Sequence, residues 1–383
     1  MIADLLVVGA GPAGCAAAMA ARRAAPSVRV LVVDAARFPR DKLCGGAVTG
    51  GGLREMELAG LSLRVPHVSA RNAVLRVEGR SHRVPLQRAT AVVCRREWDA
   101  DLVAQVRAAG AEVLEEAALR SLRREGERWV AAVGSREVRF GLAVAADGAA
   151  GPSRGLLGLP PGRRAPLREL AAEGRRQEDL VFDLDAGVAG YAWRFPCTSG
   201  GREAETAGIY SMESTRDLSD RLFHWMDRER PALGNRPPRP GAWSIRIFEP
   251  RAPTGSGAAL LAGDALGVDP LAGEGIRYAL WSGRIAGALA ARALAAGAGA
   301  RAGIPLRAAF RARLASTRSG VLLGLAVRLA ARLHQAGPGS RWRRMAADRA
   351  VAEELAALVS GAAPVVPLLR LAARYRSLGR GEP

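Results

Sequence analysis

The hydrophobic pattern at the start of the chain predicts a strand, a turn, a helix and a second strand. Residues 2–8 form an apolar run, residues 15–21 are rich in alanine, and residues 28–33 form another apolar run. Short apolar runs bounded by glycine are typical of buried strands, and alanine favours helix. These elements together predict an α/β fold that begins with a strand–helix–strand unit.

The turn between the first strand and the helix has a glycine spacing typical of nucleotide binding. Gly9 permits a tight turn, Gly11 lets the backbone approach a pyrophosphate, and Gly14 lets the helix pack closely on the sheet. The second strand ends at Asp34, which can accept hydrogen bonds from ribose hydroxyls and would repel a 2′-phosphate. The pattern predicts bound FAD or NAD rather than NADP; the alternative is a glycine-rich turn without a ligand.

The pattern of the next hundred residues mixes antiparallel strands with further α/β elements. The expected elements are two antiparallel strands within 65–90, a strand and helix over 91–109, a strand at 110–114, a hairpin over 117–140 that turns at Glu125 and Gly126, and a buried strand at 142–146 that ends in Asp147 and Gly148. An acid and a glycine after a buried strand mark a turn, which here opens another short helix.

The second half of the chain changes character twice. Residues 160–255 predict strands, loops and prolines, and a buried strand at 258–262 then leads to Gly263 and Asp264. A long helix is expected over 277–296. From residue 303 onward the sequence predicts amphipathic helices, interrupted at 337–339 and 363–364. These helices are expected to cap the core, and the alternative is that a cationic helix lies on a membrane.

One strand of the middle region carries aromatic side chains at alternate positions. Tyr191, Trp193 and Phe195 share one face of this strand because side chains alternate with a period of two. This pattern is consistent with a ridge in the hydrophobic core or with one wall of an apolar pocket.

Two loops contain residue types suited to a flat ligand. In residues 35–48, Cys44 is followed by two glycines, which allow the backbone to run close beside such a ligand, and Lys42 and Cys44 are candidates for chemistry. In the second loop, Asp264 can bond a ribitol hydroxyl. The backbone N–H groups around Gly273 and Gly275 can face an isoalloxazine ring or a phosphate.

The composition adds a strong positive charge to this picture. The chain of 383 residues has a formal net charge of +19, and Lys42 is its only lysine. The charge favours anionic partners such as NAD(P)H, diphosphates or an acidic membrane surface, although a general bias toward arginine explains it equally well. Nucleic acid is not expected, because the arginines are scattered and only 5% of the residues are aromatic.

The cysteines and the apolar runs indicate where the protein works. The four cysteines, Cys15, Cys44, Cys94 and Cys197, are widely spaced and predict neither a metal site nor a disulfide framework. We expect no signal peptide and no transmembrane helix, and therefore a cytoplasmic protein that is open to peripheral membrane contact.

The order of these motifs resembles the FAD-dependent flavoproteins built on the p-hydroxybenzoate hydroxylase fold. Within that group, two stretches are similar to the geranylgeranyl reductases: residues 42–46, which read Lys-Leu-Cys-Gly-Gly, and residues 190–196, which read Gly-Tyr-Ala-Trp-Arg-Phe-Pro. The resemblance covers roughly residues 1–290. It implies a discontinuous Rossmann-like FAD-binding domain formed by residues 1–64, 90–158 and 256–300. It also implies an antiparallel substrate-binding domain (65–89 and 159–255) and a C-terminal helical region (301–383).

The resemblance also implies roles for individual residues. Cys44 and Gly45 are the catalytic candidates on the substrate side of the flavin. Asp34 is expected at the adenosine ribose, Arg95 near the FAD phosphates and Asp264 near the ribityl phosphate. The full cofactor-binding set is Gly9, Gly11, Ala13, Gly14, Asp34, Cys44, Gly45, Arg95, Ala118, Asp147, Asp264, Gly275 and Ile276. The expected lining of the substrate tunnel is Tyr191, Trp193, Phe195 and Pro196.

We therefore expect a flavin-dependent reductase of C=C bonds in an isoprenoid or other apolar substrate, with NAD(P)H or another donor reducing the FAD. The alternative on the same fold is a flavin monooxygenase acting on an aromatic or polyketide substrate. A halogenase would need a lysine across the tunnel; Lys42, the one candidate, is in the loop near Cys44, so halogenation is not expected. A third hypothesis is a flavoprotein of another class, such as an electron carrier or a binding module.

Overall fold

The first apolar run forms a central strand of a six-stranded sheet. The structure, a computed structural model, describes residues 1–173, 178–213, 216–229, 239–334 and 340–360. The sheet has the order β16 (Gly255–Ser256), β17 (Ala259–Leu261), β10 (Leu142–Ala145), β1 (Leu5–Val8), β2 (Val30–Val33) and β6 (Glu112–Leu114). All pairs are parallel except the edge pair β16–β17. Because every residue of β1, β2 and β10 is buried, both faces of the sheet are covered.

Two helices with small residues at their contact cover one face of this sheet. Helix α1 (Pro12–Ala24) packs against α6 (Gly275–Ala295). A Cβ atom placed on Gly283 or Gly287 of α6 would lie 2.0 Å from the carbonyl oxygen of Ala13 or Ala17, respectively. The glycines therefore permit a close helix contact that larger residues would prevent. Helix α1 begins soon after β1, whereas residues 262–274 connect β17 to α6. Gly11 and Gly275 line the same cavity.

Two more helices complete this part of the molecule. The expected helix after residue 94 is confirmed as α3 (Arg95–Ala108). Helix α2 (Gly50–Ala59) was not anticipated, because its first turn consists of three glycines. Thr49 caps it by accepting a hydrogen bond from the Gly52 N–H at 3.1 Å, a role in which threonine is favoured.

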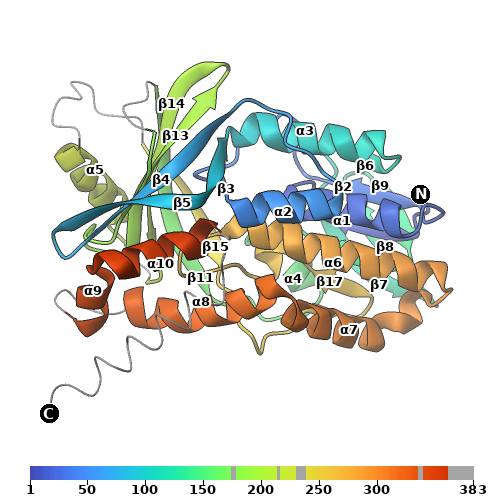
Figure 1. Cartoon of the computed structure of the whole chain (residues 1–383). Helices are drawn as coiled ribbons and strands as arrows, with labels where there is room; N and C mark the ends of the chain where they lie inside the picture. The colour runs from blue at the N-terminus through green and yellow to red at the C-terminus, as the bar shows by residue number, and fades with distance from the viewer. Residues whose placement is uncertain (174–177, 214–215, 230–238, 335–339, 361–383) are drawn as a thin grey trace, which may run out of the picture.

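A second sheet of eight strands lies beside the first (Figure 1). Its order is β15 (Gly241–Arg246), β11 (Arg164–Glu173), β14 (Arg202–Ser211), β13 (Gly190–Ser199), β12 (Leu180–Asp183), β4 (His67–Val77), β5 (Arg80–Val93) and β3 (Ala47–Val48). The antiparallel pair expected within 65–90 is confirmed as β4 and β5. Only β12 and β4 pair in parallel in this sheet.

The structure corrects two of the predicted elements. Residues 117–140 form not one hairpin but three strands, β7 (Leu119–Glu125), β8 (Arg128–Val133) and β9 (Arg136–Phe140). The expected turn at Gly126 is present, and Gly134 forms a second one, with φ of 57° and 56°, respectively.

The second correction is a helix within the region expected to hold strands and loops. Helix α5 (Leu218–Glu229) buries Leu218, Leu222, Trp225 and Met226 against the eight-stranded sheet. These positions follow helical spacing, so the signal was present in the sequence. Three short helical turns complete the assignment: α4 (Ser153–Leu156), η1 (Gly263–Ala265) and η2 (Gly299–Ala302).

The expected C-terminal helices are α7 (Gly303–Ser316), α8 (Arg318–His334), α9 (Arg341–Ala346) and α10 (Arg349–Ser360). They run along one side of the molecule, with α7 beside α6 and α10 beside β5 (Figure 1). At the 77° bend between α7 and α8, a Cβ on Gly320 would lie 1.8 Å from the Leu314 carbonyl oxygen, so glycine permits the close approach of the two helices. Thr317 starts α8 by accepting a hydrogen bond from the Gly320 N–H at 3.2 Å. The predicted breaks at 337–339 and 363–364 lie outside the described residues.

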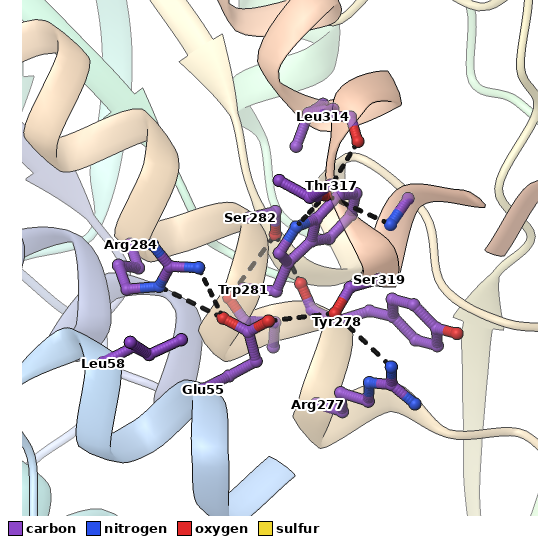
Figure 2. A network of polar contacts seen from close by, with 12 residues as sticks. Glu55, Leu58, Arg277, Tyr278, Trp281, Ser282, Arg284, Leu314, Thr317 and Ser319 are labelled. Atoms are coloured by element: carbon purple, nitrogen blue, oxygen red, sulfur yellow. Dashed lines mark hydrogen bonds and ion pairs between the residues drawn. The ribbon is translucent and has the colours of Figure 1, made fainter. Parts of the chain in front are cut away.

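A buried polar network ties the start of α8 to α2 and α6 (Figure 2). Glu55 of α2 accepts hydrogen bonds from Arg284 Nη2 at 2.6 Å and from Ser319 Oγ at 2.9 Å. Arg277 of α6 donates to the same serine at 3.4 Å. The C-terminal helices are thus attached to the first part of the chain by a specific contact. Among the described residues, no single helix is long and apolar enough to cross a membrane; α7 and α8 meet that criterion only as a bent pair.

Candidate functional site

The predicted motifs meet in one cavity of about 640 Å³ between the two sheets. The predicted site residues that line it are Gly9, Gly11, Ala13, Asp34, Cys44, Arg95, Asp147, Tyr191, Trp193, Phe195, Asp264, Gly275 and Ile276. Its volume lies in the range of small-molecule and cofactor sites.

The glycine turn has the geometry that a pyrophosphate requires. Gly9 has φ of +99°, and a Cβ on Gly14 would lie 1.8 Å from the Gly9 carbonyl oxygen. A Cβ on Gly11 would meet only Arg40 Nη2 within the described part of the chain, at 3.6 Å, so protein packing does not require glycine at this position. No side chain caps the N-terminus of α1, and its first N–H groups remain available to an anion.

Asp34 is held by the backbone at the end of β2. Its carboxylate accepts hydrogen bonds from the N–H groups of Ala10 at 2.7 Å and Ala36 at 2.8 Å. Each oxygen thus has one backbone donor and retains capacity for a ribose hydroxyl. The position and the chemistry both fit the adenosine half of a dinucleotide.

A buried ion-pair cluster flanks the glycine turn. Arg95 makes a bidentate pair with Asp99, both contacts at 2.8 Å, and Arg40 Nη2 lies 3.2 Å from the same carboxylate. Burial lowers the pKa of Arg95, but the Asp99 carboxylate and Cys44 raise it by more. The net shift is upward, so the guanidinium stays charged. Sequence reasoning missed Arg40, because its loop has no recognisable spacing relative to Gly11.

Two acids at strand ends line the same cavity. Asp147 Oδ2 accepts a hydrogen bond from the Ser153 N–H at 2.8 Å. The carboxylate of Asp264 receives no hydrogen bond from any residue that the structure describes, and burial raises its pKa. Asp264 is therefore available to a polar ligand group, whereas Asp147 is partly occupied in holding its own turn.

The Cys44 loop packs against the aromatic strand. A Cβ on Gly45 would lie 2.7 Å from the Phe195 ring and 3.1 Å from Trp193 Nε1, so the loop approaches these rings as only glycine allows. Lys42 Nζ lies 3.3 Å from the centroid of the Trp243 ring, a cation–π contact. Burial lowers the pKa of Lys42 to about 8.

The aromatic strand is both a core ridge and a cavity wall. Tyr191, Trp193 and Phe195 are at most 7% exposed and belong to a hydrophobic cluster, yet all three line the cavity. The Phe182 ring packs at 5.1 Å from Phe195 and 5.7 Å from Tyr191, between centroids. The strand therefore forms both a ridge in the hydrophobic core and a wall of the cavity, the two interpretations that the sequence left open.

Sequence reasoning also missed two cavity residues at the start of helices. Glu274, which precedes α6, accepts a short hydrogen bond from the hydroxyl of Thr49 and lies 3.5 Å from Arg277 Nη1. Burial raises the pKa of Glu274 to about 7, although Arg277 opposes the shift. Glu274 lies within a predicted loop, so its sequence position gave some signal; its partner Thr49 is distant in sequence and gave none.

Four predicted site residues are not part of the cavity lining. Gly14 and Gly45 pack on neighbouring protein atoms. Ala118 lies at the start of β7, where its carbonyl accepts a hydrogen bond from the Gly134 N–H at 2.9 Å. Pro196 follows Phe195 on β13 and therefore points to the opposite face of the strand.

A second cavity of about 90 Å³ adjoins the first, beneath the C-terminal helices. Phe182, Tyr191, Ala272 and Glu274 line both cavities. Most of the remaining lining is apolar and comes from β4, β5, the residue that follows β12, α8 and α10: Ala73, Leu75, Val84, Leu184, Leu322, Ala326, Leu333, Ala352, Leu355 and Ala356. His334 of α8 closes one side, its Nε2 2.7 Å from the Leu271 carbonyl oxygen.

A parallel sheet with this glycine turn, an acid at the end of β2 and a deep cavity beside a second sheet is typical of a dinucleotide-binding protein. A family model described as FAD dependent oxidoreductase matches residues 4–148. A menaquinone reductase of Mycobacterium tuberculosis is 32% identical over 75% of this chain and 76% of its own. Digeranylgeranylglycerophospholipid reductase 1 of Methanopyrus kandleri is 31% identical over 76% and 81%. The chain belongs to the geranylgeranyl reductase family of FAD-dependent oxidoreductases and is an enzyme that uses FAD.

Solved structures agree on the fold. A geranylgeranyl bacteriochlorophyll reductase-like protein of Thermoplasma acidophilum superposes with a TM-score of 0.77 at 18% identity, covering 98% of this chain and 97% of that one. A flavin-dependent brominase superposes with a TM-score of 0.71 at 16% identity, covering 98% and 100%. Since reductases and halogenating enzymes share this fold, the fold alone does not distinguish their reactions.

Proposed function

We propose that this enzyme reduces C=C bonds in the isoprenoid chain of a lipid. The observation that carries the proposal is the apolar cavity beneath α8 and α10, which adjoins the cofactor cavity at Tyr191 and Phe182. A hydrocarbon chain in that cavity would reach the wall formed by Trp193 and Phe195. The names of the relatives, which include menaquinone and digeranylgeranylglycerophospholipid reductases, support the same substrate class.

The binding energy for such a chain would come from burial. Each CH₂ group removed from water contributes about 0.8 kcal/mol, so an apolar chain binds without many polar contacts. Because an isolated alkene has no carbonyl to polarise, the protein contributes alignment and exclusion of water. The aromatic wall and the apolar second cavity suit both tasks.

We assign the FAD to the larger cavity. Asp34 would bind the ribose of its adenosine, and Gly11 with the N-terminus of α1 and Arg40 would bind the pyrophosphate. Asp264 would bind the ribityl region, and the backbone at Gly275 and Ile276 would lie near the flavin ring. When bound and reduced, FAD supplies a hydride. Cys44 is proposed on the substrate side, next to the aromatic wall.

We further propose that NAD(P)H reduces the FAD. Mixing the oxidised enzyme anaerobically with NADPH, NADH or a reduced electron-carrier protein tests this directly. Bleaching of the flavin absorbance by NAD(P)H is the expected result, and bleaching by the carrier alone would overturn it.

Contact with a membrane surface would give the enzyme access to a lipid substrate. The net charge of +19 supports binding to anionic vesicles. Cosedimentation with phosphatidylglycerol vesicles at low salt, lost at high salt, is the expected result; equal binding to neutral vesicles would contradict it.

The deciding experiment is a single turnover without oxygen. The enzyme is reduced with one equivalent of dithionite and mixed with geranylgeranyl diphosphate, which has no quinone ring that could take the electrons in place of a C=C bond. We expect reoxidation of the flavin together with a product heavier by two hydrogens per reduced bond, detected by mass spectrometry. A parallel arm mixes the reduced enzyme with oxygen. A long-lived oxygenated flavin spectrum, without hydrogenated product in the first arm, would favour the monooxygenase alternative.

A further inference from the structure

Glu169 occupies an unusual position on the cavity face of the eight-stranded sheet. It lies on β11 directly opposite Gly208 of β14, and Gly208 lies directly opposite Trp193 of β13. Residues opposite one another across adjacent strands share a face of the sheet. Glu169 and Trp193 both line the large cavity, as this register requires.

The residues opposite Glu169 on its two neighbouring strands are both glycines, and other side chains cover them. A Cβ on Gly208 would lie 2.1 Å from the Trp193 ring, so the indole covers that position. On the other side, Glu169 is opposite Gly241 of β15, where a Cβ would lie 2.6 Å from Leu43 Cδ1. On this face of the sheet, Glu169 thus lies between one position covered by an indole and another covered by a leucine side chain.

The hydrogen bonding of Glu169 is incomplete. Its Oε1 accepts a hydrogen bond from the Cys44 N–H at 2.8 Å, which ties it to the Cys44 loop. Its Oε2 is buried and has no partner within the described part of the chain, and no described cation lies within 4.0 Å of the carboxyl group. The residue as a whole is only 5% exposed. A buried carboxylate with a single donor is costly, whereas the neutral acid is not.

The charged and titratable groups around Glu169 do not reverse this preference. Burial raises the pKa of Glu169 to about 7, and the Cys44 N–H, Arg95 of α3 and Lys42 lower it only in part. Cys197 of β13 also faces this carboxyl group, and its own pKa is raised by burial to about 11, so the thiol stays neutral.

Burial also raises the pKa of three other acids of the cavity, and these acids differ from Glu169 in their partners. Glu274 pairs with Arg277 and accepts from Thr49. Asp147 accepts from the Ser153 N–H. Burial raises the pKa of Asp264 as well, and the positive charges of Lys42, Arg95 and Arg246 oppose this rise.

We propose that Glu169 is the proton donor of the reaction, an assignment that rests on the proposed reduction of an isoprenoid C=C bond. One alkene carbon gains the hydride that reduced FAD supplies. The electron pair of the broken π bond forms a C–H bond between the other carbon and the proton on Oε2. The O–H bond breaks and leaves Glu169 as a carboxylate, which takes a proton from solvent before the next turnover.

The first test observes the proton itself, without substrate. The protein is labelled with ¹³C-glutamate and loaded with FAD. Infrared difference spectra are then recorded while the pH is raised from about 5 to about 9, a range that spans a carboxyl pKa raised by burial. We expect a protonated carboxylic-acid C=O band that disappears as pH rises and that is missing from Glu169→Gln. A wild-type spectrum without a band assignable to Glu169 would overturn the proposal.

The second test measures the step in which the proton moves. Glu169→Gln should retain FAD and the wild-type rate of flavin reduction, but its reoxidation by the isoprenoid should slow by roughly 10²–10⁴-fold, the usual contribution of general acid catalysis. Glu169→Asp should recover part of the rate, and Glu112→Gln, an exposed acid on β6, should match the wild type. In the wild type the rate should fall as pH rises through the Glu169 titration, and in Glu169→Gln it should not.

The outcomes separate the two proposals. If the wild type hydrogenates the isoprenoid and Glu169→Gln does so equally fast, the proton-donor assignment fails and the proposed function stands. If the wild type hydrogenates none of the isoprenoids, both fail.

Discussion

Ser319 Oγ donates a 2.9 Å hydrogen bond to Oε1 of Glu55, although 264 residues separate them in the sequence. The same carboxylate pairs with Arg284, so one buried acid connects α2, α6 and the start of α8 (Figure 2). Since α8 covers the apolar cavity, this contact fixes the roof of the proposed substrate site relative to the cofactor site.

Removing Glu55 should destabilise the protein more than removing Ser319. Glu55→Ala leaves Arg284 without its partner, and we expect a loss on the order of 2 kcal/mol in the free energy of unfolding. This is less than for a fully buried pair because Arg284 is 22% exposed. Ser319→Ala should cost about 1 kcal/mol, because it removes the hydrogen bond to Glu55 and the longer one from Arg277 but leaves the Glu55–Arg284 pair in place. Urea unfolding followed by circular dichroism measures both, and a larger loss in Ser319→Ala would contradict the network.

Two alanine substitutions in the glycine turn should have different consequences. Gly14→Ala places a Cβ 1.8 Å from a backbone oxygen, so we expect a loss of about 3 kcal/mol or more in folding stability. Gly11→Ala meets no protein atom closer than 3.6 Å and should fold normally, but its Cβ would occupy the space assigned to the pyrophosphate. FAD affinity should fall roughly tenfold or more, equal to about 1.4 kcal/mol. Thermal melts and flavin absorbance separate the two effects; normal FAD binding by Gly11→Ala would argue against the assigned cofactor site.

Trp193→Phe should affect the substrate more than the cofactor. The smaller ring leaves part of the cavity wall unfilled, and we expect a roughly tenfold lower kcat/KM for an isoprenoid with unchanged FAD content. Trp225→Phe is the matched control, because Trp225 packs on the other face of the sheet and donates to Asp183 at 2.8 Å. It should lose about 1–3 kcal/mol of stability without a change in kcat/KM. If Trp193→Phe instead lost stability without a change in kcat/KM, Trp193 would belong to the hydrophobic core alone.

The buried His334 should make stability depend on pH. Burial lowers its pKa to about 4, below the ordinary value of 6.5, so the unfolded state binds the proton more readily. The neutral His334 ring therefore contributes about 3 kcal/mol to the free energy of unfolding relative to acidic solution. This contribution is complete above pH 6.5 and is lost as pH falls toward 4. Glu169 and Glu274 act in the opposite direction, since their raised pKa values add stability as pH falls from 7 toward 4.5.

The difference between the wild type and His334→Gln isolates the histidine contribution. Glutamine can still donate to the Leu271 carbonyl, but it does not titrate. We expect the stability of the wild type to fall more steeply than that of the variant between pH 6.5 and 4. Parallel curves would mean that His334 is not buried as a neutral ring.

Much of the cofactor site followed from local spacing. Gly9, Gly11 and Asp34 were predicted correctly as neighbours of one cavity, because the strand–turn–helix–strand unit sets their geometry within a short stretch. The aromatic residues of β13 were predicted on one face for the same reason, since strand periodicity is local. Helix α5 shows that such a signal can be present and still be overlooked when turns and prolines surround it.

The sequence by itself determined the α/β class, the glycine turn and the aromatic strand, because each depends on residues a few positions apart. Only the tertiary structure decided that Arg40 joins Asp99, that Cys44 meets Glu169 from 125 positions away, and that α8 and α10 roof a second cavity. The physical reason is that the order of strands and the packing of helices bring these partners together. Neither is encoded in the spacing of any one segment, so no periodicity in the chain reports these contacts.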